Sequence, residues 1–306
     1  MTSTVHAADP DLLDGQAGSG DAADPGADAA AEAREIGRIL ADGKLAYVAI
    51  GTARGPLVTP VLYGAAGGAI WVLTNHHALK ARVWRKRPRA GWTVRSGNTA
   101  VAFTGEATML SVRDVKAVLA RPLGLVAVPP AVLSWACRNP RQVGGFVRDA
   151  IVHPTRGMPQ DFVLVRLQPD SATIVRDLDD ATAVQDADPR FAAVAPDGLA
   201  ELTTQRTGIL GLTTPDGPVA IPAGWDHEQS VIRLSAAAAH LVAGAGAEGC
   251  MTFDEPVHLR PTEQRGIVLR GQVNPVAGDD SGSLAFAADR VTYWDGFTVE
   301  TVDIPG

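Results

Sequence analysis

The sequence predicts a mainly β chain with short helices, an α+β fold made of two similar antiparallel barrels in tandem, the first with a helical insertion. Strand-like segments of five to eight residues recur between Gly, Pro and Asp turns. A segment near the N-terminus also aligns with one near the C-terminus, and proline-broken helical periodicity occurs over 111–160. The chain has 306 residues, 46% hydrophobic and 20% charged, which is ordinary composition for one large domain or two smaller ones.

The N-terminal segment, residues 1–33, is predicted to be a disordered acidic tail. It holds seven acidic residues and no Lys or Arg, so it accounts for the whole net charge of −7. Its Ala, Gly and Asp show no sustained apolar period, so it cannot bury enough surface to offset the entropy of ordering. The remaining residues, 34–306, are electrically neutral.

Composition also bears on location. No apolar run approaches the roughly 20 residues that cross a bilayer, and the N-terminus has no secretory signal. Two cysteines, Cys137 and Cys250, are too few for a disulfide framework or a Cys-based zinc site, and we expect both to be buried structural thiols. We therefore expect a cytoplasmic protein that binds no membrane.

An internal repeat sets the domain organisation. Residues 55–74 align without gaps on 217–236, a shift of 162. The identities are Gly55 with Gly217, Pro56 with Pro218, Pro60 with Pro222, and Ile70 with Ile232. Further on, Asp170 aligns with Asp289 at a shift of only 119, so the first copy carries 43 extra residues. The alternative, chance similarity between Gly- and Ala-rich strands, does not explain why strand, proline, strand and helix recur in one order.

The predicted boundaries follow from the repeat. The chain divides into the tail 1–33, a first barrel domain 34–180 with a helical insertion 111–160, a linker 181–202, and a second barrel domain 203–306. Each copy has one short helix among its strands, at about 77–87 and 236–243. We expect two or three short helices in the insertion, ended by prolines, which remove a backbone donor and clash with the preceding turn.

A basic cluster marks a candidate binding site in the first copy. Seven basic residues and no acid lie within 80–95. In an otherwise neutral body this indicates an anionic ligand, of which phosphate is the commonest kind. The alternative is a solvated helix end beside Pro88, so we assign a ligand role to only one or two side chains. A helix start presents free N–H groups and a positive dipole end, which suits phosphate.

Residues 44–94 resemble the pyridoxamine 5′-phosphate oxidase-like superfamily of flavin-binding split β-barrels. The resemblance extends over about 44–110 and 161–176, and more weakly over 203–300. It implies that a helix start holds the phosphate of FMN or of the related deazaflavin coenzyme, and that the second strand lies along the ring. The implied phosphate residues are Thr74, Asn75, Lys80 and Arg82, and the implied ring residues are Thr59, Pro60, Val61 and Leu62.

The second copy departs from this pattern. On the gapless alignment it has Ala236 opposite Thr74 and Val242 opposite Lys80, so we expect it to have lost its own site. The resemblance places the flavin at a homodimer interface, so a fused chain is expected to be an intramolecular pseudo-dimer, with a homodimer also allowed. Candidate ring contacts are Trp71 and Trp84 in the first copy and Trp225, Tyr293 and Trp294 in the second, with core packing as the alternative for each.

The resemblance implies a flavin-dependent oxidoreductase, with FMN or deazaflavin as cofactor, acting on a small molecule; no catalytic residue is assigned. The alternative is a non-catalytic, degenerate split barrel that carries a cofactor or haem, or acts as a scaffold. The C-terminus lacks the Arg and His pattern by which a true pyridoxamine phosphate oxidase holds substrate phosphate.

No sequence motif supports a dinucleotide-binding, metal-dependent, hydrolytic or nucleic-acid-binding function. The G-x-G-x-x-G match at Gly244–Gly249 lacks the strand-to-helix context of a dinucleotide site. His76 and His77 are adjacent, so their side chains diverge and form no chelating pair. No H-E-x-x-H or G-x-S-x-G motif is present, and the basic cluster is too small for nucleic acid.

Overall fold

The computed structural model describes residues 25–111, 130, 132–141, 143–144, 162–178, 186–196, 198–255, 264–276, 282–296 and 298–305. Tertiary contacts divide the chain into two units, Met1–Glu35 and Ile36–Gly306. Helix α1 (Pro25–Asp42) begins inside the predicted tail, which corrects that prediction for residues 25–33. Proline is tolerated in a first helical turn, and the Ala, Glu and Arg that follow favour helix. The rest of the predicted tail, most of the insertion, and 181–185 and 197 of the linker lie outside the described residues.

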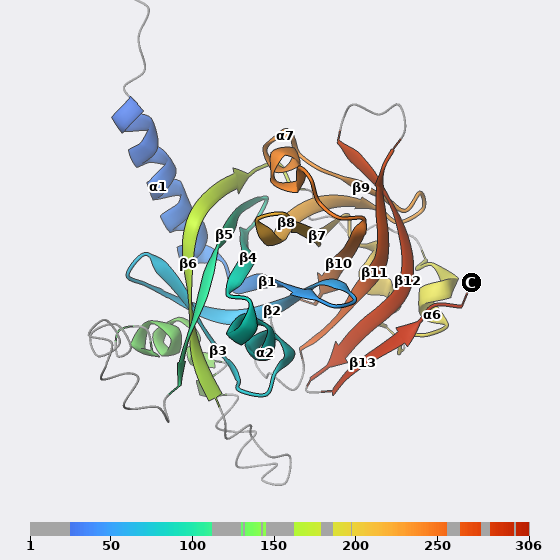
Figure 1. Cartoon of the computed structure of the whole chain (residues 1–306), viewed down its shortest axis with the longest axis horizontal. Coiled ribbons are helices and arrows are strands. Elements are labelled where there is room, and N and C mark those ends of the chain that lie inside the picture. The colour runs from blue at the N-terminus through green and yellow to red at the C-terminus, as the bar shows by residue number, and fades with distance from the viewer. Residues whose placement is uncertain are drawn as a thin grey trace, which may run out of the picture. The chain divides into compact units, whose positions relative to one another are not determined.

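The first barrel is closed and antiparallel (Figure 1). Its elements are β1 (Leu45–Thr52), β2 (Gly55–Ala66), β3 (Ala69–Asn75), α2 (Leu79–Lys86), β4 (Arg89–Ser96), β5 (Thr99–Ser111) and β6 (Phe162–Val175). The strands pair in the cyclic order β1-β2-β3-β6-β5-β4. The long β5–β6 connection contains the region where the sequence places the helical insertion.

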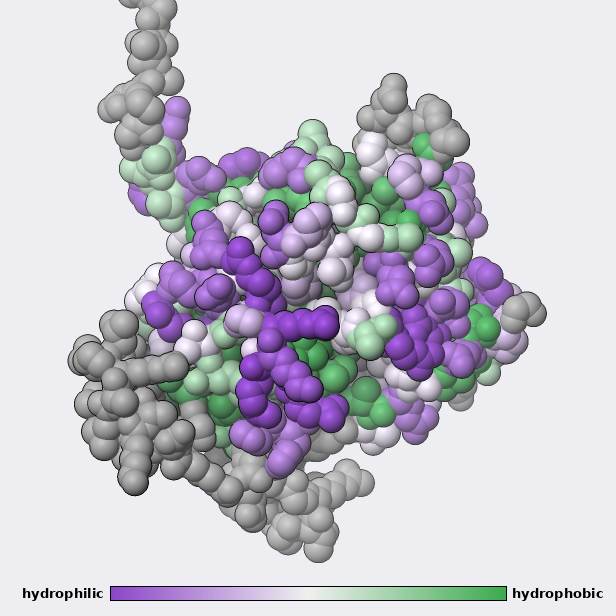
Figure 2. All heavy atoms as spheres, viewed as in Figure 1, coloured by the Kyte–Doolittle hydropathy of each residue, from purple (hydrophilic) through white to green (hydrophobic). Residues whose placement is uncertain are grey.

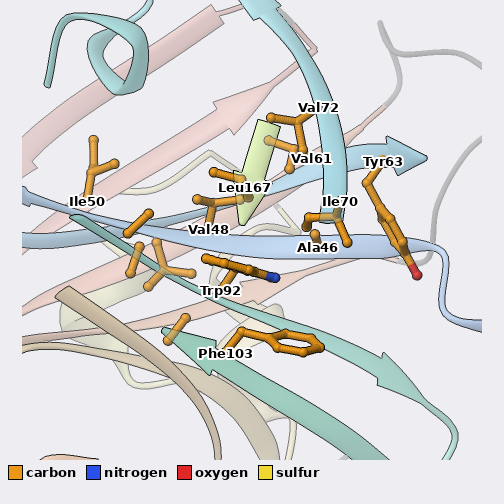
Figure 3. Close-up of a cluster of buried hydrophobic side chains, with 14 of the residues drawn as sticks. Ala46, Val48, Ile50, Val61, Tyr63, Ile70, Val72, Trp92, Phe103 and Leu167 are labelled. Carbon is orange, nitrogen blue, oxygen red and sulfur yellow. The ribbon is translucent and has the colours of Figure 1, made fainter. Parts of the chain in front are cut away.

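Alternation along the strands fills the interior of the first barrel. Val48 pairs in register with Thr59 on one side and with Trp92 on the other, so these three residues share one face of the sheet. Figure 3 shows Val48 and Trp92 within the buried cluster, together with Val61 and Leu167. Helix α2 adds its own buried residues to this cluster, Ala81 and Trp84.

The second barrel repeats the same strand order. Its elements are α6 (Pro189–Ala192), η1 (Ala200–Thr204), β7 (Thr207–Thr214), β8 (Gly217–Asp226), β9 (Val231–Arg233), α7 (Ala236–Ala239), η2 (His240–Val242), β10 (Glu248–Asp254), β11 (Arg265–Pro275), β12 (Ser283–Asp295) and β13 (Thr298–Asp303). The pairings β7-β8-β9-β12-β11-β10 match the first barrel strand for strand, β11–β12 pairing completes the ring, and β13 adds to β12. The predicted fold of two tandem split β-barrels is confirmed.

The pairing register shows that the repeat holds at the level of single residues. The β1–β2 hairpin pairs Thr52 with Gly55, and the β7–β8 hairpin pairs Thr214 with Gly217, which is the predicted shift of 162. A β-bulge also recurs, between Thr104 and Gly105 in β5 and between Arg270 and Gly271 in β11. A Cβ at either bulge glycine would meet a carbonyl oxygen of the neighbouring strand, at 2.0 and 1.9 Å, so both bulges require glycine.

One detail of the predicted alignment is wrong. Tyr63 pairs with Val72, whereas its counterpart Trp225 pairs with Ile232, so β9 matches β3 at a shift of 160 rather than 162. The counterpart of Thr74 is therefore Leu234, not Ala236 as the gapless alignment predicted. A slip of two residues keeps every side chain on the same face of the sheet, so hydrophobic alternation does not reveal it.

The two barrels pack against each other through equivalent strands. Thr93 Oγ1 donates to the carbonyl oxygen of Ala220 at 2.6 Å, and Thr252 Oγ1 donates to that of Val58 at 3.2 Å. Val58 and Ala220 are repeat partners, so the two contacts are related by pseudo-twofold symmetry, as in an isologous dimer interface. Gly211 allows the close approach, because a Cβ there would lie 2.5 Å from Val58.

Candidate functional site

Two of the predicted cofactor residues meet in the first barrel. Lys80, the second residue of α2, donates from Nζ to Oγ1 of Thr59 on β2 at 3.2 Å. Burial of the ammonium group lowers the pKa of Lys80 to about 8. Among the described residues Lys80 has no carboxylate partner, and its ammonium group has one neutral acceptor at a partly buried position. A buried cation held in this way favours the approach of an anion.

The turn before α2 is shaped by Asn75. Its Oδ1 accepts a hydrogen bond from the backbone N–H of His77 at 2.7 Å, and its carbonyl oxygen accepts one from Ala78 at 3.0 Å. Ala78 occupies the N-cap position and supplies no side-chain acceptor to the helix. The first N–H groups of α2 therefore lack a side-chain cap, which leaves them available to an anion.

The remaining predicted residues fall into different positions. Val61 lies inside the barrel (Figure 3), on the same face of β2 as Thr59, whereas Pro60 and Leu62 face outward by alternation. Thr74 is buried in β3, and Arg82 is exposed on α2. Pro60 and Leu62 are half-buried on the outer face of β2.

Four of the five aromatic candidates for ring contact are buried in hydrophobic clusters of their own barrel. Trp84 lies in the first core and Trp225 in the second, where its Nε1 donates to the carbonyl oxygen of Thr203 at 2.8 Å. Tyr293 belongs to the second core, and Trp71 packs on Leu164. Core packing accounts for these four.

Trp294 differs from the other aromatic candidates. It belongs to the buried cluster of the first barrel although it lies on β12 of the second barrel. The residue opposite it on β11 is Gly266, where a Cβ would lie 2.1 Å from the indole, so the glycine makes room for the ring. Trp294 is therefore the second-barrel aromatic that reaches the interface.

The described part of the helical insertion contacts β2, the strand that carries the implied ring residues. Residues 132–138 are helical, and Ser134 exchanges hydrogen bonds with the backbone of Ala65, donating at 2.9 Å and accepting at 3.1 Å. Trp135 Nε1 donates to the carbonyl oxygen of Leu62 at 3.4 Å. Gly64 lies beneath this helix, and a Cβ there would be 2.6 Å from the backbone nitrogen of Trp135. The end of β2 is thus covered by the insertion.

A buried acid at the barrel interface was not predicted from the sequence. Tyr47, paired with Pro60 on β1–β2, donates its hydroxyl to Oδ1 of Asp254 on β10 at 2.9 Å. Burial raises the pKa of Asp254 to about 7, and the hydrogen bond from Tyr47 partly opposes the shift. No local sequence pattern pointed to this pair, because Tyr47 and Asp254 lie 207 residues apart in the chain.

The surface near α2 is strongly hydrophilic and borders hydrophobic surface (Figure 2). Arg85, Lys86 and Arg87 are exposed there, in keeping with a solvated helix end for most of the basic cluster. No group of three or more potential metal ligands occurs within the described ranges. Cys250 is buried, and burial raises the pKa of its thiol to about 11, whereas Cys137 is exposed, which corrects the expectation for that residue.

No helix in the described part of the chain has the length and apolar character needed to cross a membrane. No family model matches the sequence, and no curated protein matches it. Solved structures similar to it include a conserved hypothetical protein from Mycobacterium tuberculosis (20% identity, 50% of this chain and 92% of that one, TM-score 0.34). An FAD-binding protein from Mesorhizobium loti is similar at 16% identity, over 46% and 92% of the two chains, with a TM-score of 0.32.

A third similar structure comes from Clostridium acetobutylicum, a protein of the pyridoxinephosphate oxidase family related to general stress protein 26. It shares 14% identity over 48% of this chain and 89% of that one, with a TM-score of 0.32. Of these three solved structures, one is described as FAD-binding and one as a member of the pyridoxinephosphate oxidase family. The split-barrel fold itself rests on the strand order and register of this chain.

Proposed function

We propose that the chain binds one flavin, with FMN favoured over a deazaflavin, and transfers electrons or hydride to or from a small molecule. The observation that carries the proposal is Lys80, a desolvated cation beside Thr59 in the first turn of α2. The helix start adds uncapped N–H groups, so a phosphate there would gain both charge neutralisation and hydrogen bonds. A bound flavin supplies the redox chemistry itself, so the protein needs to bind, orient and shield it.

The flavin ring is proposed to lie along the outer face of β2, against Pro60 and Leu62. Trp294 from the second barrel would close the site from the other side. The insertion helix holds the end of the same strand through the hydrogen bonds of Ser134 with Ala65. Asp254, with its pKa near 7, is the titratable group at this interface that could hold or release a proton near neutral pH.

The second barrel is proposed to act as the cover rather than as a second site. Ser235 caps its short helix α7 by accepting from the N–H of Ala238 at 3.2 Å, and Ala236–Ala239 contains no cation. The chain would thus supply by itself both halves of a site that separate subunits form in a homodimer. Support comes from the pseudo-symmetric contacts of Thr93 and Thr252 across the interface.

The direct test is reconstitution of the purified chain with FMN or the deazaflavin coenzyme, followed by anaerobic reduction and reoxidation. Binding of either cofactor with fluorescence quenching, and turnover with small electron acceptors, supports an oxidoreductase. Binding without any turnover would support the alternative, a non-catalytic protein that carries the cofactor. Absence of binding to both cofactors would refute the proposal.

A further inference from the structure

We propose that Arg270 and Arg290, on the face of the second barrel that meets the first, form a binding site for an oxyanion, the phosphate or carboxylate group of a small molecule. This site lies outside the proposed flavin site and is made of different residues.

The geometry brings two cations together with little solvent. Arg270 on β11 and Arg290 on β12 pair directly in register, and each residue is less than a tenth exposed, at 8% and 9%. Both donate to the same acceptor, the carbonyl oxygen of Arg54 in the β1–β2 turn. Side chains paired in this way have Cβ atoms about 4.5–5.5 Å apart. The two guanidinium groups therefore lie within reach of one atom.

Neutralisation of this pair is incomplete. Nε of Arg290 donates to Asp289 at 2.8 Å, and Asp303 lies opposite Arg290 on β13, but the two carboxylate side chains are 53% and 79% exposed. Arg270 has hydrogen bonds only to the carbonyl oxygen of Arg54 and to Oγ1 of Thr52, with no carboxylate partner in the described ranges. Its buried Nε has no hydrogen-bond partner there. Burial and the neighbouring Arg290 also lower the pKa of Arg270.

An unpaired buried guanidinium is expensive, and two like charges make it more so. The planar guanidinium group of arginine can donate two parallel hydrogen bonds to the oxygens of a phosphate or carboxylate. A bound anion would also supply the negative charge that the pair lacks. Arg54 adds a third cation at the rim, held at 3.6 Å by the exposed Asp303. The unbonded Nε of Arg270, beside the guanidinium group of Arg290, is thus placed to donate to an anion.

The repeat offers a comparison for these two arginines. At the equivalent positions of the first barrel, just before the repeated bulge, stand Thr104 and Ser171. Their hydroxyl oxygens lie 2.6 Å apart and satisfy one another without any charge. The first barrel therefore carries two small, uncharged residues at these positions, and Ser171 is exposed. The second barrel carries two buried arginines there, so the repeat places positive charge at this position in one barrel only.

The test is thermal denaturation and calorimetric titration of the full chain with sodium phosphate and with sodium acetate, against sodium chloride at equal ionic strength. We expect saturable stabilisation by at least one oxyanion that chloride does not reproduce, and the stronger of the two identifies the group. Arg270→Gln should weaken this binding at least tenfold, whereas the exposed, ion-paired Arg233→Gln should not change it. Arg270→Lys, which keeps the charge but loses the fork, gives an intermediate result and covers the case in which Arg270→Gln does not fold.

Lys80→Met separates this site from the flavin site. Oxyanion binding that survives in Lys80→Met and is lost in Arg270→Gln supports the proposal, whether or not the chain binds flavin. Equal effects of the oxyanions and chloride, unchanged affinity in Arg270→Gln, or loss of all binding in Lys80→Met would each overturn it.

Discussion

Replacing Lys80 by methionine separates cofactor binding from folding. Methionine keeps the length and apolar stem of the side chain but removes the ammonium group that donates to Thr59. If this group neutralises the flavin phosphate, the variant loses one charge-assisted hydrogen bond, about 2–3 kcal/mol. That corresponds to a roughly 30- to 150-fold weaker affinity for FMN. The apo-protein should be at least as stable as the parent at pH 7, because the variant no longer holds a desolvated charge.

The pH dependence of binding gives the same test without a substitution. The pKa of Lys80 in the free protein is about 8, and a bound phosphate would raise it. Affinity should therefore be constant near pH 7 and fall above pH 8, by about tenfold at pH 9, as the amine of the free protein loses its proton. The Lys80→Met variant should not show this fall.

The assay is titration of apo-protein with FMN, followed by quenching of flavin fluorescence, at several pH values. Lys86→Met is the matched control, because Lys86 lies on the same helix but is exposed. Its affinity should stay within about twofold of the parent, since an exposed charge contributes little. Equal affinity in parent and Lys80→Met, or the same pH profile in both, would show that the basic cluster is only a solvated helix face.

Three further outcomes are expected. The pKa of Asp254 is raised in the folded state, so the stability of the parent relative to Asp254→Asn should fall as pH rises from about 4 to about 7; a pH-independent difference in denaturant unfolding would contradict this. Gly64→Ala should cost about 1–3 kcal/mol by pushing the Trp135 helix off β2, whereas Gly37→Ala, which meets no atom within 4 Å, should be neutral or stabilising; equal melting temperatures would refute the contact. Alkylation of the native protein should label Cys137 and spare Cys250, and mass spectrometry showing label on Cys250 would mean that the barrel interface opens.

The hairpins were predictable because their signals are local. Turn residues, alternation and the two aligned segments fix the hairpins, and the pairing of Thr52 with Gly55 and of Thr214 with Gly217 follows at the predicted shift. The two-residue slip in β9 was not predictable, because alternation has period two and the slip leaves every face unchanged. The sequence assigned the whole stretch Thr59–Leu62 to the ligand, whereas in the strand Val61 faces the interior and Pro60 and Leu62 face outward, because successive residues of a strand face opposite sides.

The candidate site was predictable only in part. The contact between Lys80 and Thr59 joins segments 21 residues apart, and the basic cluster pointed to it. Contacts across the barrel interface join Tyr47 to Asp254 and Thr52 to Arg270, 207 and 218 residues apart, and no local pattern places such residues together. These buried charges depend on how the two barrels pack, so they became visible only with the fold.

The stoichiometry of flavin binding tests the central claim most directly. Titration of the purified, full-length apo-protein with FMN, read by fluorescence quenching and by the mass of the complex, should give one flavin per chain in a monomer. One flavin shared between two chains would contradict the intramolecular cover supplied by the second barrel. Two flavins per chain would show that α7, despite its lack of a cation, retains a site, and no binding of either FMN or the deazaflavin would mean that the fold is present without a flavin ligand.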